Sequence, residues 1–161
     1  MPTEVAEDSK KLRSYVGQEL YLGIDPGLNG AAVAVTSRGK VLNVIDFSKV
    51  TIVDIAKEFF MMADRIQFAS LEKVHAMPGQ GVSSTFKFGQ AYGTVRALLT
   101  AYSIKFEEVT PNKWMTKMQC QTKGDKRVTK EAAQRLFPEH KWTHKTSDAV
   151  LIAEYCRRTY G

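Results

Sequence analysis

The hydrophobic period of the chain changes near Thr51, and this change restricts the possible fold more than any other feature. Before it, turn residues separate three apolar runs of strand length: Leu20 to Ile24, Gly30 to Thr36 and Val41 to Phe47. After it, apolar residues recur at the spacing of an amphipathic helix: Ile52, Ile55, Ala56, Phe59, Ala63 and Ile66. The pattern predicts three antiparallel strands followed by a helix.

Strand and helix patterns alternate through the rest of the chain. The later predicted elements are a strand over Phe68 to Val74, a helix from about Thr85 to Tyr102, a strand over Ile104 to Val109, a short helix begun by Pro111, and helices over Val128 to Phe137 and Thr146 to Arg158. The order β-β-β-α-β-α-β-α-α predicts an α/β fold with helices flanking a five-stranded mixed sheet. Three strands are antiparallel, and two parallel additions join through helices.

The chain is long enough for one domain with a real core, because 43% of its 161 residues are apolar. We expect residues 1 to 17 to be a flexible leader with a single helical turn near Lys10 to Tyr15, and residues 18 to 161 to be one domain. No apolar run approaches the about 18 residues of a membrane span, and no signal peptide is apparent. Two cysteines without metal-ligand spacing, Cys120 and Cys156, indicate an intracellular, reducing compartment.

Positive charge is concentrated in the second half of the chain. The formal net charge is +6, with 9 basic and 10 acidic residues before position 81 and 14 and 7 from there on. This excess suits a polyanionic partner such as nucleic acid. Six basic residues fall in one short polar segment, where a solvated loop is the simpler alternative: Lys113, Lys117, Lys123, Lys126, Arg127 and Lys130.

Three acidic residues occupy positions that are unusual for purely structural side chains. Asp25 ends the first strand, Glu72 lies near the end of the fourth, and Asp148 lies in the first turns of the last helix. Ligands collect at the carboxyl ends of strands in such sheets, so these acids can converge. Taken singly, Asp25 could begin a turn, Glu72 could be solvated, and Asp148 could interact with the helix dipole.

Converging carboxylates repel one another unless cations lie between them. Oxygen ligands without a cysteine partner suit Mg²⁺ or Mn²⁺ better than zinc. Two such ions would activate a water and stabilise both oxygens of an in-line phosphodiester displacement. The three acids therefore favour a metal-dependent nuclease.

Several segments carry a family resemblance that covers about residues 20 to 158. These are Leu22 to Gly27 (Leu-Gly-Ile-Asp-Pro-Gly), Leu71 to Val74, Phe86 to Gly93, Pro111 to Trp114, Ala132 to Pro138 and Ser147 to Ala153. In this order they resemble the RuvC-type Holliday junction resolvases of the RNase H-like superfamily, especially compact phage and organelle members. The resemblance implies an RNase H-like fold and a cytoplasmic, host-cytoplasmic or organellar location.

The resemblance also implies an activity and a set of ligands. It implies a homodimer that cleaves four-way DNA junctions and leaves 5′-phosphate and 3′-hydroxyl ends. Asp25, Glu72 and Asp148 would bind two Mg²⁺ ions, with Mn²⁺ as a substitute. Whether a branch-migration motor is a partner stays open.

One position departs from the family pattern, which usually has a fourth acid or a histidine shortly before the last acid. Here that stretch contains His144 and Lys145. Neutral His144 could bind metal or act as a general base, or it could be an ordinary polar residue before the helix. Lys145 could neutralise a scissile phosphate.

Candidate DNA contacts lie in three segments. In the basic segment, Lys123, Lys126, Arg127 and Lys130 are expected to bind the DNA backbone, and the resemblance brings Lys126 close to the cleaved strand. His75 takes the place of an aromatic residue that in bacterial relatives enters the junction, and Lys87 opens a helix that could hold a phosphate. Phe86 and Phe88 are interpreted as core or dimer contacts, and Trp114 as a core anchor.

Other functions stay open at this point. The same carboxylates would serve a less selective nuclease on branched DNA or RNA-DNA hybrids. A phosphotransferase would depend on Gly23 to Gly30 alone. A non-catalytic DNA-binding module would explain why the fourth acid is missing, but it would not explain why the three acids Asp25, Glu72 and Asp148 are all present.

Overall fold

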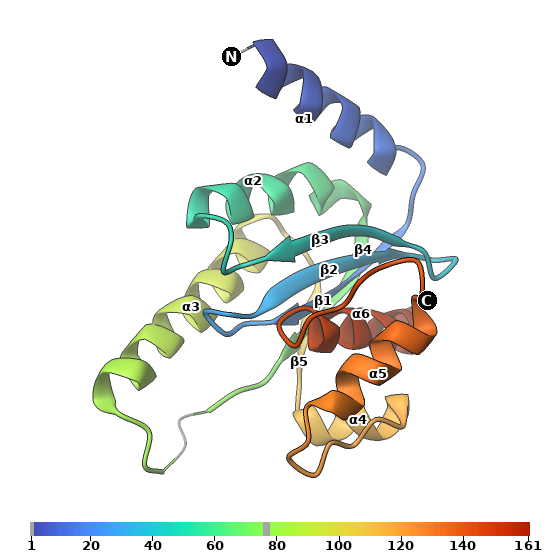
Figure 1. Ribbon diagram of the computed structural model, residues 1–161. Coiled ribbons are helices and arrows are strands. Elements are labelled where there is room, and N and C mark those ends of the chain that lie inside the picture. Colours follow the sequence, from blue (N-terminus) through green and yellow to red (C-terminus); the bar gives the residue numbers. More distant parts are fainter. Residues whose placement is uncertain (1, 76–77) are drawn as a thin grey trace.

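A computed structural model describes residues 2 to 75 and 78 to 161 and places a five-stranded sheet at the centre of the molecule (Figure 1). The strand order is β3-β2-β1-β4-β5, with β1 pairing antiparallel to β2 and parallel to β4. The strands are β1 (Leu20–Asp25), β2 (Ala31–Thr36), β3 (Val41–Asp46), β4 (Ile66–Glu72) and β5 (Phe106–Val109). The predicted mixed sheet, with three antiparallel strands and two parallel additions, is confirmed.

Helices cover both faces of the sheet (Figure 1). On one face, α2 (Ile52–Met62) and α3 (Val82–Ala101) enclose a core with Phe59, Met62 and Leu99; a short 3-10 helix, Ala63–Arg65, follows α2. On the other face, a second core lies beneath three helices: α4 (Pro111–Met118), α5 (Arg127–Leu136) and α6 (Ser147–Tyr160). The two-layer cover buries both faces of β1, which explains its nearly continuous apolar sequence.

Two helix starts follow directly from local sequence. Thr51 caps α2 in a capping box with Asp54, each side chain binding the other residue's backbone N–H. Thr110 caps α4, whose first residue is Pro111, where the missing N–H costs nothing. The helix start predicted at Pro111 is therefore confirmed, and α3 begins three residues before its predicted start.

Helix α6 lies directly against β1, and Gly23 makes this possible. A Cβ at Gly23 would lie 2.0 Å from the backbone N of Ala153 and 2.4 Å from the backbone O of Ala149. No side chain fits there without moving the helix away from the strand. Gly23 thus brings the start of α6, with Asp148, close to the end of β1, with Asp25.

The segment expected to be a flexible leader forms a 14-residue helix in the structure, α1 (Pro2–Tyr15). Tyr15 is only 2% exposed, and its Oη accepts a 3.0 Å hydrogen bond from Asn43 Nδ2. Ion pairs join Lys11 to Glu58 and Asp8 to Lys57, so α1 is held against α2 mainly by polar contacts. Its sequence has no wide apolar stripe, and periodicity alone therefore did not reveal it.

No helix in the described part of the chain combines the length and the apolar character needed to cross a membrane.

Candidate active site

The three predicted acids come from elements that meet at one edge of the sheet. In the parallel pair β1 and β4, Ile24 lies opposite Leu71, so the next residues, Asp25 and Glu72, end neighbouring strands. Asp148 is the second residue of α6, which packs on β1. The fold therefore brings all three to the carboxyl ends of the two central strands.

The pKa values of the three acids indicate that their charges interact. Burial, with a smaller contribution from Asp148, raises the pKa of Asp25 to about 6, although a backbone hydrogen bond from Gly27 lowers it. Burial raises the pKa of Glu72 to about 7, and both Asp25 and Asp148 contribute. Burial also raises the pKa of Asp148. Each carboxylate is thus short of compensating positive charge.

Hydrogen bonds hold each acid differently. Gly27 N donates to Asp25 Oδ1 at 3.2 Å, and the indole Nε1 of Trp114 donates to Glu72 Oε1 at 2.9 Å. The Thr129 side chain lies near Asp148 and lowers its pKa, and Asp148 Oδ1 is buried with no hydrogen-bond partner among the described residues. An unpartnered buried carboxylate oxygen is costly, and a cation is the natural partner that it lacks.

The donor set fits a divalent cation in chemistry and charge. Three carboxylates that repel one another, one of them with an oxygen that no described residue hydrogen-bonds, supply hard ligands and excess negative charge. In the described residues, however, no three or more His, Cys, Asp or Glu side chains are drawn together as they would be around a metal ion. The acids of this site are adjacent, but they are not closed into a coordination shell.

Lys126 is the basic residue most closely tied to the acids. Its charge lowers the pKa of Asp25, Glu72 and Asp148 alike. Lys126 precedes α5 and lines a groove of about 440 Å³ together with Asp25. We name this the Asp25 groove; its other lining residues are Gly27, Leu28, Asn29, Gly30, Gln80, Ser84, Lys87, Phe88, His144 and Lys145.

Three of the other predicted contacts also line the Asp25 groove. Lys87 lines it from α3. His144 lines it and lowers the pKa of Asp148, as a positive charge near that acid would. Lys145 lines it too, while its Nζ donates to Ser48 Oγ at 3.0 Å. The structure thus brings both residues that could replace the fourth acid beside the same acidic edge.

The remaining predicted contacts lie outside the lining of the Asp25 groove. Arg127 is bound by Asp125, with Nη2 to Oδ2 at 2.8 Å, so its charge is already paired. Lys123, at a φ of +47°, and Lys130, on α5, are exposed. His75 is exposed and precedes residues 76 and 77, which fall outside the described residues.

Two site residues were missed or only half interpreted from sequence. Trp114 is fully buried, as a core anchor should be, but its N–H also binds Glu72. The signal was present, because a buried indole N–H needs an acceptor. Thr129 carries no sequence signal, since its contact with Asp148 depends on how α5 packs on α6.

Comparison with solved structures identifies the fold. No protein-family model matches the sequence, and no curated protein sequence matches it. RuvC of Thermus thermophilus in complex with a Holliday junction substrate aligns with a TM-score of 0.60 and 15% identity, over 88% of this chain and 96% of that one. Another Thermus thermophilus RuvC structure aligns with a TM-score of 0.56 and 15% identity, over 87% and 96%. The chain therefore has the RuvC-like, RNase H-like fold that the sequence predicted.

Proposed function

We propose that this protein is an endonuclease that hydrolyses phosphodiester bonds of four-way DNA junctions, with residues 18 to 161 as its nuclease domain. The observation that carries the proposal is the set of three electrostatically coupled acids, Asp25, Glu72 and Asp148, facing Lys126. The similar Thermus thermophilus structure with a Holliday junction substrate supports the choice of DNA substrate.

The chemistry follows from the groups at the acidic edge. Asp25, Glu72 and Asp148 would hold two Mg²⁺ ions, or Mn²⁺ in their place, which supply an activated water and stabilise the charge of the reacting phosphate. Lys126 and Lys87 would bind the phosphates that enter the Asp25 groove. His144, which lines the Asp25 groove, would in its neutral form accept the proton of the attacking water, leaving 5′-phosphate and 3′-hydroxyl products.

Lys126→Ala is expected to weaken binding to DNA of any sequence, because a phosphate contact carries no base information. The slope of log affinity against log salt should become less negative by about 1. Fluorescence anisotropy with a labelled junction over a salt series measures this. Lys40→Ala is the matched control, since Lys40 is exposed in the turn between β2 and β3 and does not line the Asp25 groove. An equal change of the salt-dependence slope in both variants would mean that Lys126 is a solvent-exposed charge without a specific phosphate contact.

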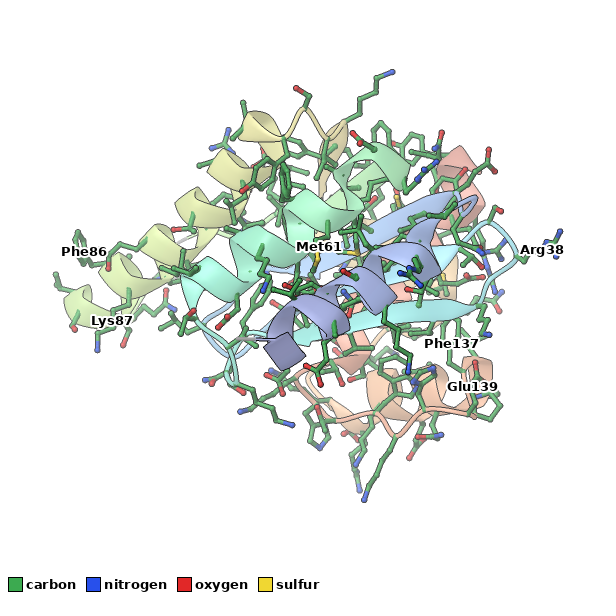
Figure 2. All side chains as sticks on the ribbon, turned by 90° about the horizontal axis from the view of Figure 1, so that it is seen from above. Arg38, Met61, Phe86, Lys87, Phe137 and Glu139 are labelled. Atoms are coloured by element: carbon green, nitrogen blue, oxygen red, sulfur yellow. The ribbon has the colours of Figure 1, made fainter. Side chains whose placement is uncertain are left out.

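The exposed face of α3 supports a homodimer. Val82 is 88% exposed and Phe86 66% exposed. Both lie on one stripe with Gly89 and Gly93, where an added Cβ would meet no atom of the described residues within 4 Å. Figure 2 shows Phe86 at the end of α3 that extends from the body. An apolar knob beside small residues suits close packing against the same helix of a second copy.

Phe86→Glu is therefore expected to halve the mass measured by light scattering, because a charge would be buried between the two helices. Val53→Glu, on α2, is the control: Val53 is 75% exposed but lies on another helix. A wild-type protein that is already monomeric at micromolar concentration would contradict the dimer.

The function is tested by cleavage of a labelled four-way junction, a linear duplex and an RNA-DNA hybrid of matching sequence, each with Mg²⁺ or with EDTA. The proposal expects paired symmetric nicks in the junction alone, and only with metal. Equal cutting of all three substrates would indicate the less selective nuclease. Binding without cutting would indicate a non-catalytic DNA-binding module.

A further inference from the structure

Trp114 connects the core beneath α4 to the acidic edge. Its side chain is 0% exposed, and its one polar atom, Nε1, donates to Glu72 Oε1 at 2.9 Å. Trp114 is 42 residues from Glu72 in the chain, so only the tertiary fold brings them together. The indole is an uncharged donor, and it restrains a carboxylate without cancelling its charge.

The backbone around this pair is held on both sides. Glu72 lies opposite Val109 in the parallel pair β4 and β5, and Lys73 N donates to Val109 O at 2.7 Å. The Thr110 cap then starts α4 immediately after β5, which fixes the first turn that carries Trp114. The strand that ends at Glu72 and the helix that carries Trp114 are therefore connected through β5 and the Thr110 cap.

A glutamate side chain has three rotatable bonds, and a strand end alone does not fix where its carboxylate points. Glu72 is 9% exposed, and among the described residues its carboxylate accepts a side-chain hydrogen bond from Trp114. We propose that Trp114 is a positioning residue: its indole N–H holds the Glu72 carboxylate in the orientation needed to bind a divalent cation with Asp25 and Asp148. This inference rests on the proposed function, because it assumes that these acids bind metal.

Trp142 provides the matched control within the same chain. It is 2% exposed, belongs to the same core, and its Nε1 also donates a hydrogen bond, at 3.0 Å, but to the backbone O of Phe137. Trp114→Phe and Trp142→Phe each remove one buried indole N–H and part of one ring. They differ in whether the acceptor left behind is Glu72.

The experiment measures Mn²⁺ binding to the DNA-free protein by electron paramagnetic resonance, alongside thermal unfolding. Both variants are expected to lose stability. Trp114→Phe should also weaken Mn²⁺ binding by about tenfold, as expected for loss of an outer partner of a metal ligand, while Trp142→Phe should leave it within about twofold. Unchanged Mn²⁺ affinity in Trp114→Phe, or the same loss of affinity in both variants, would overturn the inference. The proposed function would still stand in either case if the wild-type protein binds Mn²⁺.

Nuclear magnetic resonance of the wild-type protein keeps the inference testable if Trp114→Phe does not fold. The chain has two tryptophans, so there are two indole N–H signals, and Trp142→Phe assigns them. Mg²⁺ should shift the Trp114 signal and leave the Trp142 signal in place. If Mg²⁺ binds but the Trp114 signal does not move, Trp114 does not position the metal ligand. If the wild type binds neither Mg²⁺ nor Mn²⁺, the proposed metal site fails and the inference fails with it.

Discussion

Asp25→Asn is expected to reduce junction cleavage by about 10³-fold or more while leaving the protein folded and more stable. The amide keeps the size of the carboxylate but is a poor ligand for a hard cation, so transition-state stabilisation of several kcal/mol is lost. Each 1.4 kcal/mol is about a tenfold change in rate. Single-turnover cleavage of a labelled junction in Mg²⁺ measures the loss.

The gain in stability should depend on pH. The pKa of Asp25 is raised to about 6 and that of Glu72 to about 7, so the folded protein binds protons more tightly than the unfolded chain does. Their contribution to stability is present below about pH 4 and is lost as pH rises through 6 to 7. The wild type should therefore lose stability as the pH rises from about 4 to about 7, and Asp25→Asn should lose less stability over the same range. Because the pKa of Asp25 rises from 3.8 to about 6, the contribution of Asp25 to this loss of stability is at most roughly 3 kcal/mol.

Asp46→Asn is the matched control, because Asp46 ends β3 as Asp25 ends β1. Burial alone would raise the pKa of Asp46, but hydrogen bonds from Ser48 bring it below the ordinary value. Its replacement should therefore lower stability at neutral pH and spare cleavage. An Asp25→Asn protein that cleaves at the wild-type rate would contradict the site, and one without a stability gain at pH 7 would contradict the repulsion.

The central sheet was predictable because each of its signals is local. The run Leu20 to Ile24 is strand-like by itself, and the Asp25-Pro26-Gly27 turn marks where it ends. Connection rules then require that strands separated by a helix add to the sheet in parallel. Because β1 and β4 are such a pair, the acids that end them were expected to lie close together, and the structure brings them to one edge.

The parts that sequence did not reveal depend on long-range polar contacts. Helix α1 has a hydrophilic sequence and docks through Tyr15, Lys11 and Asp8, whose partners lie about 28 to 49 residues further along the chain. The Trp114 contact with Glu72 crosses 42 residues. Hydrophobic period carries no information about which buried donor meets which acceptor, and these contacts therefore required the folded structure.

Gly23→Ala is expected to destabilise the protein by at least about 4 kcal/mol, among the largest effects of a single substitution. The added Cβ would fall 2.0 Å from the backbone N of Ala153 and 2.6 Å from its Cα. These are backbone atoms of α6, so no rotamer change or smaller neighbour can make room. Chemical denaturation followed by circular dichroism measures the loss.

Gly89→Ala is the control, because Gly89 lies in α3 and no atom of the part of the chain that the structure describes lies within 4 Å of an added Cβ. It should change monomer stability by less than about 1 kcal/mol, in the stabilising direction. Equal stability of Gly23→Ala and the wild type would mean that α6 does not lie against β1 as described.

Gly23→Ala protein that still folds should also be a poor nuclease. The helix that must retreat from β1 carries Asp148 in its first turn, so the distance between Asp148 and Asp25 would increase. A displacement of about 1 Å in a catalytic group costs about 10²-fold in rate. Junction cleavage should therefore fall together with stability, whereas a purely structural loss would leave the rate of the folded fraction unchanged. The glycine is needed both for the packing of the core and for the assembly of the three acids.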